Sequence, residues 1–90
     1  MDNLDTLRDE IDDIDRKITD LFEQRMDIVK KIIDYKTKNN IKILDQSREN
    51  YVVKKNVEYL NNPEYSSYLE DLFIEIMGIS RDFQSKITQK

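Results

Sequence analysis

The sequence predicts an all-α protein of three helices, with a long first helix and a second copy of the chain as its partner. Helix-breaking residues are almost absent, since there is one Gly and one Pro in 90 residues, and apolar residues recur at helical spacing. A charged fraction of 38% fits a helical bundle better than a sheet. We expect residues 1–90 to form a single domain.

The first helix is predicted over about residues 3–38, because the stretch 4–36 lacks Gly and Pro and has apolar residues alternately three and four apart. These are Leu4, Leu7, Ile11, Ile14, Ile18, Leu21, Ile28, Ile32 and Tyr35. Arg25 takes the one position in this apolar stripe that is not apolar. Such a helix is roughly 50 Å long at ~1.5 Å per residue, whereas a compact chain of this length is about 30 Å across. We therefore expect a homodimer in which the partner covers the overhanging stripe.

The other helices are predicted from capping residues and apolar spacing. The candidate end residues are Asp2 or Asn3 for the start of the first helix, Asn39 and Asn40 for its end, Asp45 or Ser47 for the start of the second, and Asn62 followed by Pro63 for the start of the third. The apolar residues are Val52, Val53, Val57 and Leu60 in the second helix, and Tyr65, Leu69, Leu72, Ile76, Ile79 and Phe83 in the third. Beside the third helix's stripe runs a row that turns polar partway: Phe73, Met77, Ser80, Gln84 and Ile87.

Composition excludes several kinds of chemistry. The chain has no Cys and no His, which excludes disulfides, thiol nucleophiles, imidazole bases and the common zinc sites. No secretory signal or membrane-length apolar run is present, so we expect a cytoplasmic protein with no membrane partner. The net charge of −4 argues against a nucleic-acid partner but allows a small anion held by locally gathered cations.

Polar residues interrupt the apolar faces of all three helices. Arg25 and Lys36 are three turns apart on the first helix, and Arg48 and Glu49 lie in the first turn of the second. Ser80 and Gln84 are one turn apart on the third helix. One interpretation is structural: Arg25 pairs with Glu49 or with an acid of the partner, Lys36 reaches solvent, and the third-helix residues bond to backbone. The other is that the surplus cations bind an anion.

The chain resembles the all-helical chorismate mutase family from Leu4 to about Ile87. The resemblance rests on Leu7-Arg8-Asp9-Glu10-Ile11, Ile14-Asp15, Arg25, Lys36, Asp45-x-x-Arg48-Glu49, and the run Leu72-Phe73 through Ile76, Ser80 and Gln84. Each piece alone is a weak signal, but together, in order and at matching separations, they are specific. The resemblance implies an intertwined dimer that converts chorismate to prephenate in phenylalanine and tyrosine biosynthesis, without a metal or cofactor. This pericyclic rearrangement needs no nucleophile or proton shuttle, which suits a chain without His or Cys.

The resemblance also implies a role for eight residues. Arg8 of the partner subunit and Arg25 would hold the two carboxylates of chorismate. Lys36 would donate to the breaking ether oxygen and to a carboxylate, and Gln84 would be the second donor to that oxygen. Glu49 would accept a hydrogen bond from the ring hydroxyl, with Asp45 and Arg48 around it. Ser80 would contact a carboxylate.

Two other functions are compatible with the same fold. One is an isochorismate–pyruvate lyase, a relative that lacks the hydroxyl-binding acid, whereas Glu49 is present here. The other is a non-catalytic dimerisation or regulatory module, which would have little reason to keep all eight polar positions. The sequence leaves open whether the protein docks onto another enzyme of the aromatic pathway.

Overall fold

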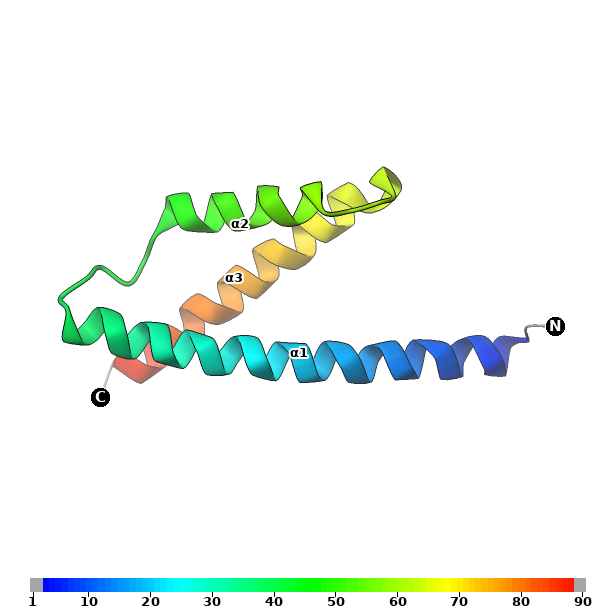
Figure 1. The fold of residues 1–90 in the computed structure, drawn as a ribbon, viewed down its shortest axis with the longest axis horizontal. Coiled ribbons are helices and arrows are strands. Elements are labelled where there is room, and N and C mark those ends of the chain that lie inside the picture. Colours follow the sequence, from blue (N-terminus) through cyan, green and yellow to red (C-terminus); the bar gives the residue numbers. More distant parts are fainter. Residues whose placement is uncertain (1–2, 89–90) are drawn as a thin grey trace.

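The computed structural model describes residues 3–88 and is all-α, as the sequence predicts (Figure 1). Its elements are α1 (Leu4–Lys38), α2 (Gln46–Glu58), the 3-10 helix η1 (Pro63–Tyr65) and α3 (Ser66–Thr88). α3 runs diagonally from the far end of α2 back to the C-terminal part of α1 (Figure 1). No helix within residues 3–88 is long and apolar enough to cross a membrane.

The N-terminal part of α1 extends well beyond the other helices (Figure 1). The chain measures 57 × 26 × 16 Å, and its radius of gyration is 16.5 Å. A compact chain of this length would have a radius of gyration of about 12 Å. The predicted overhang of the first helix is therefore confirmed.

Capping side chains determine where the helices begin. The side-chain oxygen of Asn3 accepts from the backbone N–H of Thr6 at 2.8 Å, while Asp2, the alternative cap, lies outside the described residues. Asp45 caps α2 by accepting from the N–H of Arg48 at 3.0 Å. At the other end of α1, Asn40 adopts a left-handed backbone with φ of 55°, as predicted for a helix-ending asparagine.

The third helix and the end of the second differ slightly from the prediction. Asn62 caps the short η1, accepting from the N–H of Glu64 at 3.0 Å, and α3 begins only at Ser66. α2 ends at Glu58, two residues before Leu60, because the N–H groups of Tyr59 and Leu60 bond to carbonyls three residues back. These hydrogen bonds over three residues, typical of a 3-10 turn, end α2 before the connection to η1.

Within one chain the core is small. The buried hydrophobic residues are Val29, Ile33, Val52 and Met77. The predicted stripe of α1 remains exposed along its whole length, from Leu4 at 60% to Tyr35 at 63%. The residues that α1 buries belong to the adjacent row, Val29 and Ile33, while α3 buries Met77 and Ser80. The apolar residues on the face of α1 with the most regular spacing therefore stay largely exposed within one chain.

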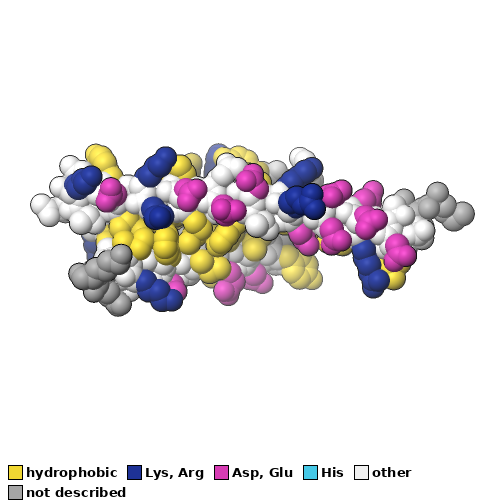
Figure 2. All heavy atoms as spheres, turned by 90° about the horizontal axis from the view of Figure 1, so that it is seen from below, with side chains coloured by type: hydrophobic (Ala, Val, Ile, Leu, Met, Phe, Trp, Pro, Cys, Tyr) yellow, Lys and Arg dark blue, Asp and Glu magenta, His cyan; other side chains and the backbone are white. Residues whose placement is uncertain are grey.

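Hydrophobic and charged side chains are segregated along α1. Hydrophobic side chains gather beside its C-terminal half, and acidic side chains crowd its overhanging N-terminal part (Figure 2). The acidic residues on this part include Asp5, Asp9, Glu10, Asp12, Asp13 and Asp15, all exposed. They suit the positive end of the helix dipole and keep that face in water.

Candidate active site

Seven of the eight predicted site residues line one cavity of about 290 Å³ between the three α-helices. They are Arg25 and Lys36 of α1, Asp45 at the cap of α2, Arg48 and Glu49 of α2, and Ser80 and Gln84 of α3. Ile28, Val29, Ile32, Ile43, Val52 and Met77 supply an apolar lining. Side chains that are up to 59 positions apart in the sequence thus line one cavity.

Arg25 reaches from α1 to α3. Its Nη1 donates to the hydroxyl of Ser80 at 3.1 Å, and Ser80 is only 6% exposed. Partial burial of the guanidinium lowers the pKa of Arg25 from its usual value, and the positive charge of Arg48 lowers it further. Arg25 is therefore a cation held in place by a neutral acceptor, with its charge available to a ligand.

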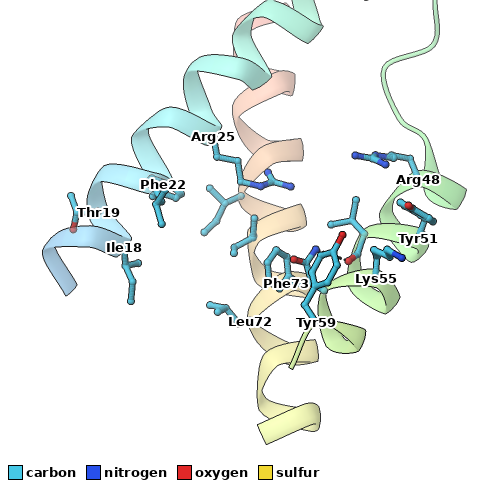
Figure 3. Close-up of a pocket in the computed structure, with 15 residues that line it drawn as sticks. Ile18, Thr19, Phe22, Arg25, Arg48, Tyr51, Lys55, Tyr59, Leu72 and Phe73 are labelled. Atoms are coloured by element: carbon cyan, nitrogen blue, oxygen red, sulfur yellow. Dashed lines mark hydrogen bonds between the residues drawn. The ribbon is translucent and has the colours of Figure 1, made fainter. Parts of the chain in front are cut away.

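Arg25 and Arg48 face each other across the opening (Figure 3). Within residues 3–88 no carboxylate lies at ion-pair distance from either guanidinium. The guanidinium of Arg48 instead lies 5.3 Å from the centre of the Tyr51 ring. Two like charges turned toward each other without an acid between them are costly unless an anion binds there.

Lys36 closes another side of the cavity. Its Nζ donates to the carbonyl of Ile43 at 3.0 Å, so it ties α1 to the connector before α2. The structural interpretation, in which Lys36 simply reaches solvent, is therefore wrong. An ammonium has three protons to donate, so Lys36 retains donors for a ligand while it holds the connector.

Two acids, Asp45 and Glu49, lie at the start of α2, and each already interacts with other groups of the chain. Asp45 accepts from the N–H of Arg48 and from the hydroxyl of Ser47, which lowers its pKa, and the nearby Lys36 and Arg48 add to this. Glu49 forms an ion pair with Arg81 of α3. Of the two partners considered for Arg25, Glu49 is wrong, because its carboxylate pairs with Arg81 and not with Arg25.

Arg81 is the residue that the sequence did not single out. It follows Ser80 directly and points to the side of α3 that faces α2, where it meets Glu49. In the sequence, Arg81 could have been noticed only because it is next to Ser80, a predicted site residue. Its separation of 32 residues from Glu49 does not indicate that the two side chains pair. Only the packing of α2 against α3 brings the two together.

The last two predicted site residues, Gln84 and Arg8, have different positions relative to the cavity. Gln84 lines the cavity one turn beyond Ser80, so the structure brings it to the site. Arg8 does not line the cavity; it lies exposed on the overhanging part of α1. A site that includes Arg8 therefore needs a second chain.

A larger, mainly apolar cavity of about 860 Å³ adjoins the first. Both cavities are lined by Arg25, Arg48 and Val52, so the pair of guanidinium groups marks where they meet. α1 contributes Ile18 and Phe22 to the larger one, and α3 contributes Leu72 and Phe73 (Figure 3). An apolar space of this size beside the cationic site is suited to an apolar helix of another chain.

The smaller cavity is lined by groups suited to binding an anion. Three cations and two acids line it, and both acids are occupied by a helix cap and by Arg81. Among residues 3–88, no three acidic side chains are grouped as metal ligands would be. The positive surplus stands out in a chain whose net charge is −4.

Together, the fold and the cavity define an all-helical protein with a site for a small anion. The sequence profile of the family described as chorismate mutase type II matches residues 7–85. The chain belongs to this family.

A curated relative agrees with this assignment. The bifunctional chorismate mutase/prephenate dehydratase of Buchnera aphidicola subsp. Acyrthosiphon pisum (strain APS) is 39% identical over 72 residues. The match covers 76% of this chain and 19% of the relative, so the chain spans about a fifth of the length of that protein.

Proposed function

We propose that this chain, as one domain over residues 1–90, catalyses the rearrangement of chorismate to prephenate. The observation that carries the proposal is the gathering of seven predicted site residues around one cavity with surplus positive charge. Membership of the chorismate mutase type II family supports the choice of substrate. Chorismate carries two carboxylates, and the free cations of the cavity are complementary to it.

Arg25 and the partner's Arg8 bind the two carboxylates in this proposal. A guanidinium binds a carboxylate through two parallel hydrogen bonds, which sets the orientation of the substrate as well as its affinity. The bond from Arg25 to Ser80 orients the guanidinium in advance. Holding both carboxylates at a set separation favours the compact conformer of chorismate in which the reacting carbons are close.

Lys36 and Gln84 act on the bond that breaks. Negative charge develops on the ether oxygen in the transition state, and donors aimed at that oxygen lower the barrier. An ammonium and a carboxamide serve this purpose without a proton transfer. Lys36 is bonded to the carbonyl of Ile43, which limits the directions in which its ammonium can point.

Glu49 accepts the ring hydroxyl of chorismate, with Asp45 and Arg48 beside it. This acid favours a mutase over an isochorismate–pyruvate lyase. A purely structural module of the same fold has no use for two guanidinium groups that face each other across an open cavity (Figure 3).

The proposal includes a homodimer. Four buried hydrophobic side chains are too few to stabilise a chain of 90 residues by themselves. Large hydrophobic residues of α1 from Leu4 to Leu21 are more than 40% exposed. A second copy, with its α1 lying along the larger cavity, would cover both apolar surfaces and bring the partner's Arg8 toward Arg25 and Arg48.

The direct test is a reaction assay. Purified protein incubated with chorismate should consume it and form prephenate with no added metal or cofactor. Formation of pyruvate from isochorismate would favour the lyase, and absence of both reactions would favour a non-catalytic module. For the whole protein, the proposal also includes a cytoplasmic location. It allows docking to another enzyme of the aromatic pathway.

A further inference from the structure

Arg81 pairs with one of the acids of the cavity although it does not line that cavity itself. Its Nη1 donates to Oε1 of Glu49 and thereby joins α3 to α2. The side chain of Glu49 is 15% exposed and that of Arg81 is 46% exposed, so the carboxylate lies between the cavity and a guanidinium near the surface. Among residues 3–88, the other ion pairs join side chains three or four positions apart on one helix.

The pair affects the charge balance of the cavity. Glu49 shares the cavity with Arg25, Lys36 and Arg48, and a mostly buried carboxylate requires a cationic partner. If Glu49 paired with one of those three, it would neutralise a charge that the substrate needs. Because Arg81 supplies the partner from outside, the cations of the cavity stay free. The second oxygen of Glu49 also remains an acceptor for a donor in the cavity.

Gly78 makes room for this arrangement. It is the one glycine of the chain and lies inside α3, where glycine is less favourable than alanine. A Cβ placed on Gly78 would lie 3.6 Å from Nη2 of Arg81, which is an ordinary contact. A longer side chain in a rotamer directed toward Arg81 would meet the guanidinium. The absence of a side chain at residue 78 therefore leaves Arg81 free to lie along α3 and reach Glu49.

We propose that Arg81 is a positioning residue that holds Glu49 away from the cavity's cations and orients its second oxygen toward the ring hydroxyl of the substrate. This inference rests on the proposed function, because it concerns the same cavity. It adds a residue that acts on substrate binding through Glu49 without touching the substrate.

A double-mutant cycle tests the inference. Arg81→Gln should raise the KM for chorismate roughly tenfold, the effect expected when one charge-assisted hydrogen bond is lost, with a smaller change in kcat. In a Glu49→Gln background, the same change should alter KM by less than about twofold, because the carboxylate that Arg81 positions is gone. Arg81→Lys, which keeps the charge, should recover part of the loss.

Two matched controls separate positioning from general effects. Lys86→Gln removes a positive charge from the same helix and breaks the exposed pair with Asp82, and it should leave KM unchanged. Gly78→Leu keeps both members of the pair but fills the space beside the guanidinium, so it should raise KM as Arg81→Gln does. Gly78→Ala should keep the wild-type KM. These two variants also test the inference if Arg81→Gln fails to fold.

Clear outcomes would overturn the inference. If Arg81→Gln has the same effect with and without Glu49, or no more effect than Lys86→Gln, Arg81 does not act through Glu49. Wild-type protein that forms no prephenate would instead contradict the proposed function. In that case, calorimetric titration of the same variants with chorismate tests the inference by affinity, and a wild type that does not bind chorismate overturns both proposals.

Discussion

The guanidinium groups of Arg25 and Arg48 set the character of the cavity at the scale of single residues. They face each other without an acid between them, and the pKa of Arg25 is lowered by its burial and by Arg48 (Figure 3). A bound dianion would relieve this repulsion, so the two guanidinium groups favour the binding of a negatively charged ligand. In the proposed mechanism, the rate depends instead on the donors to the ether oxygen.

Gln84→Glu tests the role of one such donor. A carboxamide donates at any pH, whereas a carboxylic acid donates only while protonated. The variant should lose roughly 10²–10³-fold in rate at pH 7.5, the usual effect of removing one donor to a developing oxyanion. It should regain part of that rate as the pH falls toward 5. Steady-state rates of prephenate formation across this range provide the measurement.

The variant is compared with wild type at each pH, so that any effect of pH common to both proteins cancels. The carboxyl of Asp45 does not titrate in this range, because its hydrogen bonds from the N–H of Arg48 and the hydroxyl of Ser47 lower its pKa. Its contribution to α2 is therefore fully present between pH 5 and 7.5 and is lost only at lower pH, as the pH falls through the lowered pKa. A variant with the same pH profile as wild type would show that Gln84 does not donate to the ether oxygen.

At the scale of elements, the end of α1 determines where the connector to α2 begins. The backbone of Asn40 is left-handed, and the N–H of Ile41 bonds back to the carbonyl of Lys36 at 2.9 Å. The side chain of Lys36 holds the same connector through Ile43. The helix terminus and a site residue therefore depend on one local conformation.

Asn40→Ala should be less stable than Asn40→Gly by about 1 kcal/mol, because alanine has a Cβ and lacks the polar side chain that helps asparagine adopt the left-handed region. Asn40→Gly should be neutral or slightly stabilising, since glycine adopts this conformation freely. Urea unfolding of both variants at one protein concentration measures the difference. Equal midpoints for the two variants would mean that the positive φ of Asn40 does not limit stability.

At the scale of the whole molecule, the exposed apolar stripe of α1 is the main feature that one chain leaves unexplained. A 35-residue helix that buries only Val29 and Ile33 gains little from its own chain. Most helical stability in proteins comes from packing of an apolar face. We therefore expect the extended N-terminal part of α1 to require a partner in order to persist as a helix.

Ile14→Asp should dissociate the dimer and abolish activity, because a charge on the stripe would be buried without a partner. Wild type should sediment at twice the 10.9 kDa mass of the chain. Arg16→Asp, an exposed position two residues from Ile14 and hence on the opposite side of α1, is the control and should remain dimeric. A folded, active monomer at micromolar concentration would contradict the dimer.

Arg8→Ala and Arg25→Ala should each be nearly inactive, yet a mixture of the two should regain activity. If Arg8 crosses to the partner's site, a heterodimer contains one site with both arginines and one with neither. Subunit exchange in mild denaturant followed by the prephenate assay measures the recovery. No recovery would mean that Arg8 acts within its own subunit or not at all.

The sequence by itself determined the helices, their caps and the composition of the site. Apolar spacing and the caps Asn3 and Asp45 act over three or four residues, so they can be recognised without knowledge of the fold. The resemblance to a helical family identified seven residues that the structure gathers around one cavity. The overhang of α1 followed from its length alone.

Only the tertiary structure decided how the charges are paired. Arg25 bonds to Ser80 across 55 positions, Glu49 pairs with Arg81 across 32, and Lys36 bonds to a backbone carbonyl. The sequence left open whether Arg25 pairs with Glu49 or with an acid of the partner, because charge alone does not tell which side chains meet. Helix packing brings Arg81 to Glu49 and, within residues 3–88, leaves no carboxylate at ion-pair distance from Arg25 or Arg48. This geometry is the basis for the proposal that the cavity binds an anion.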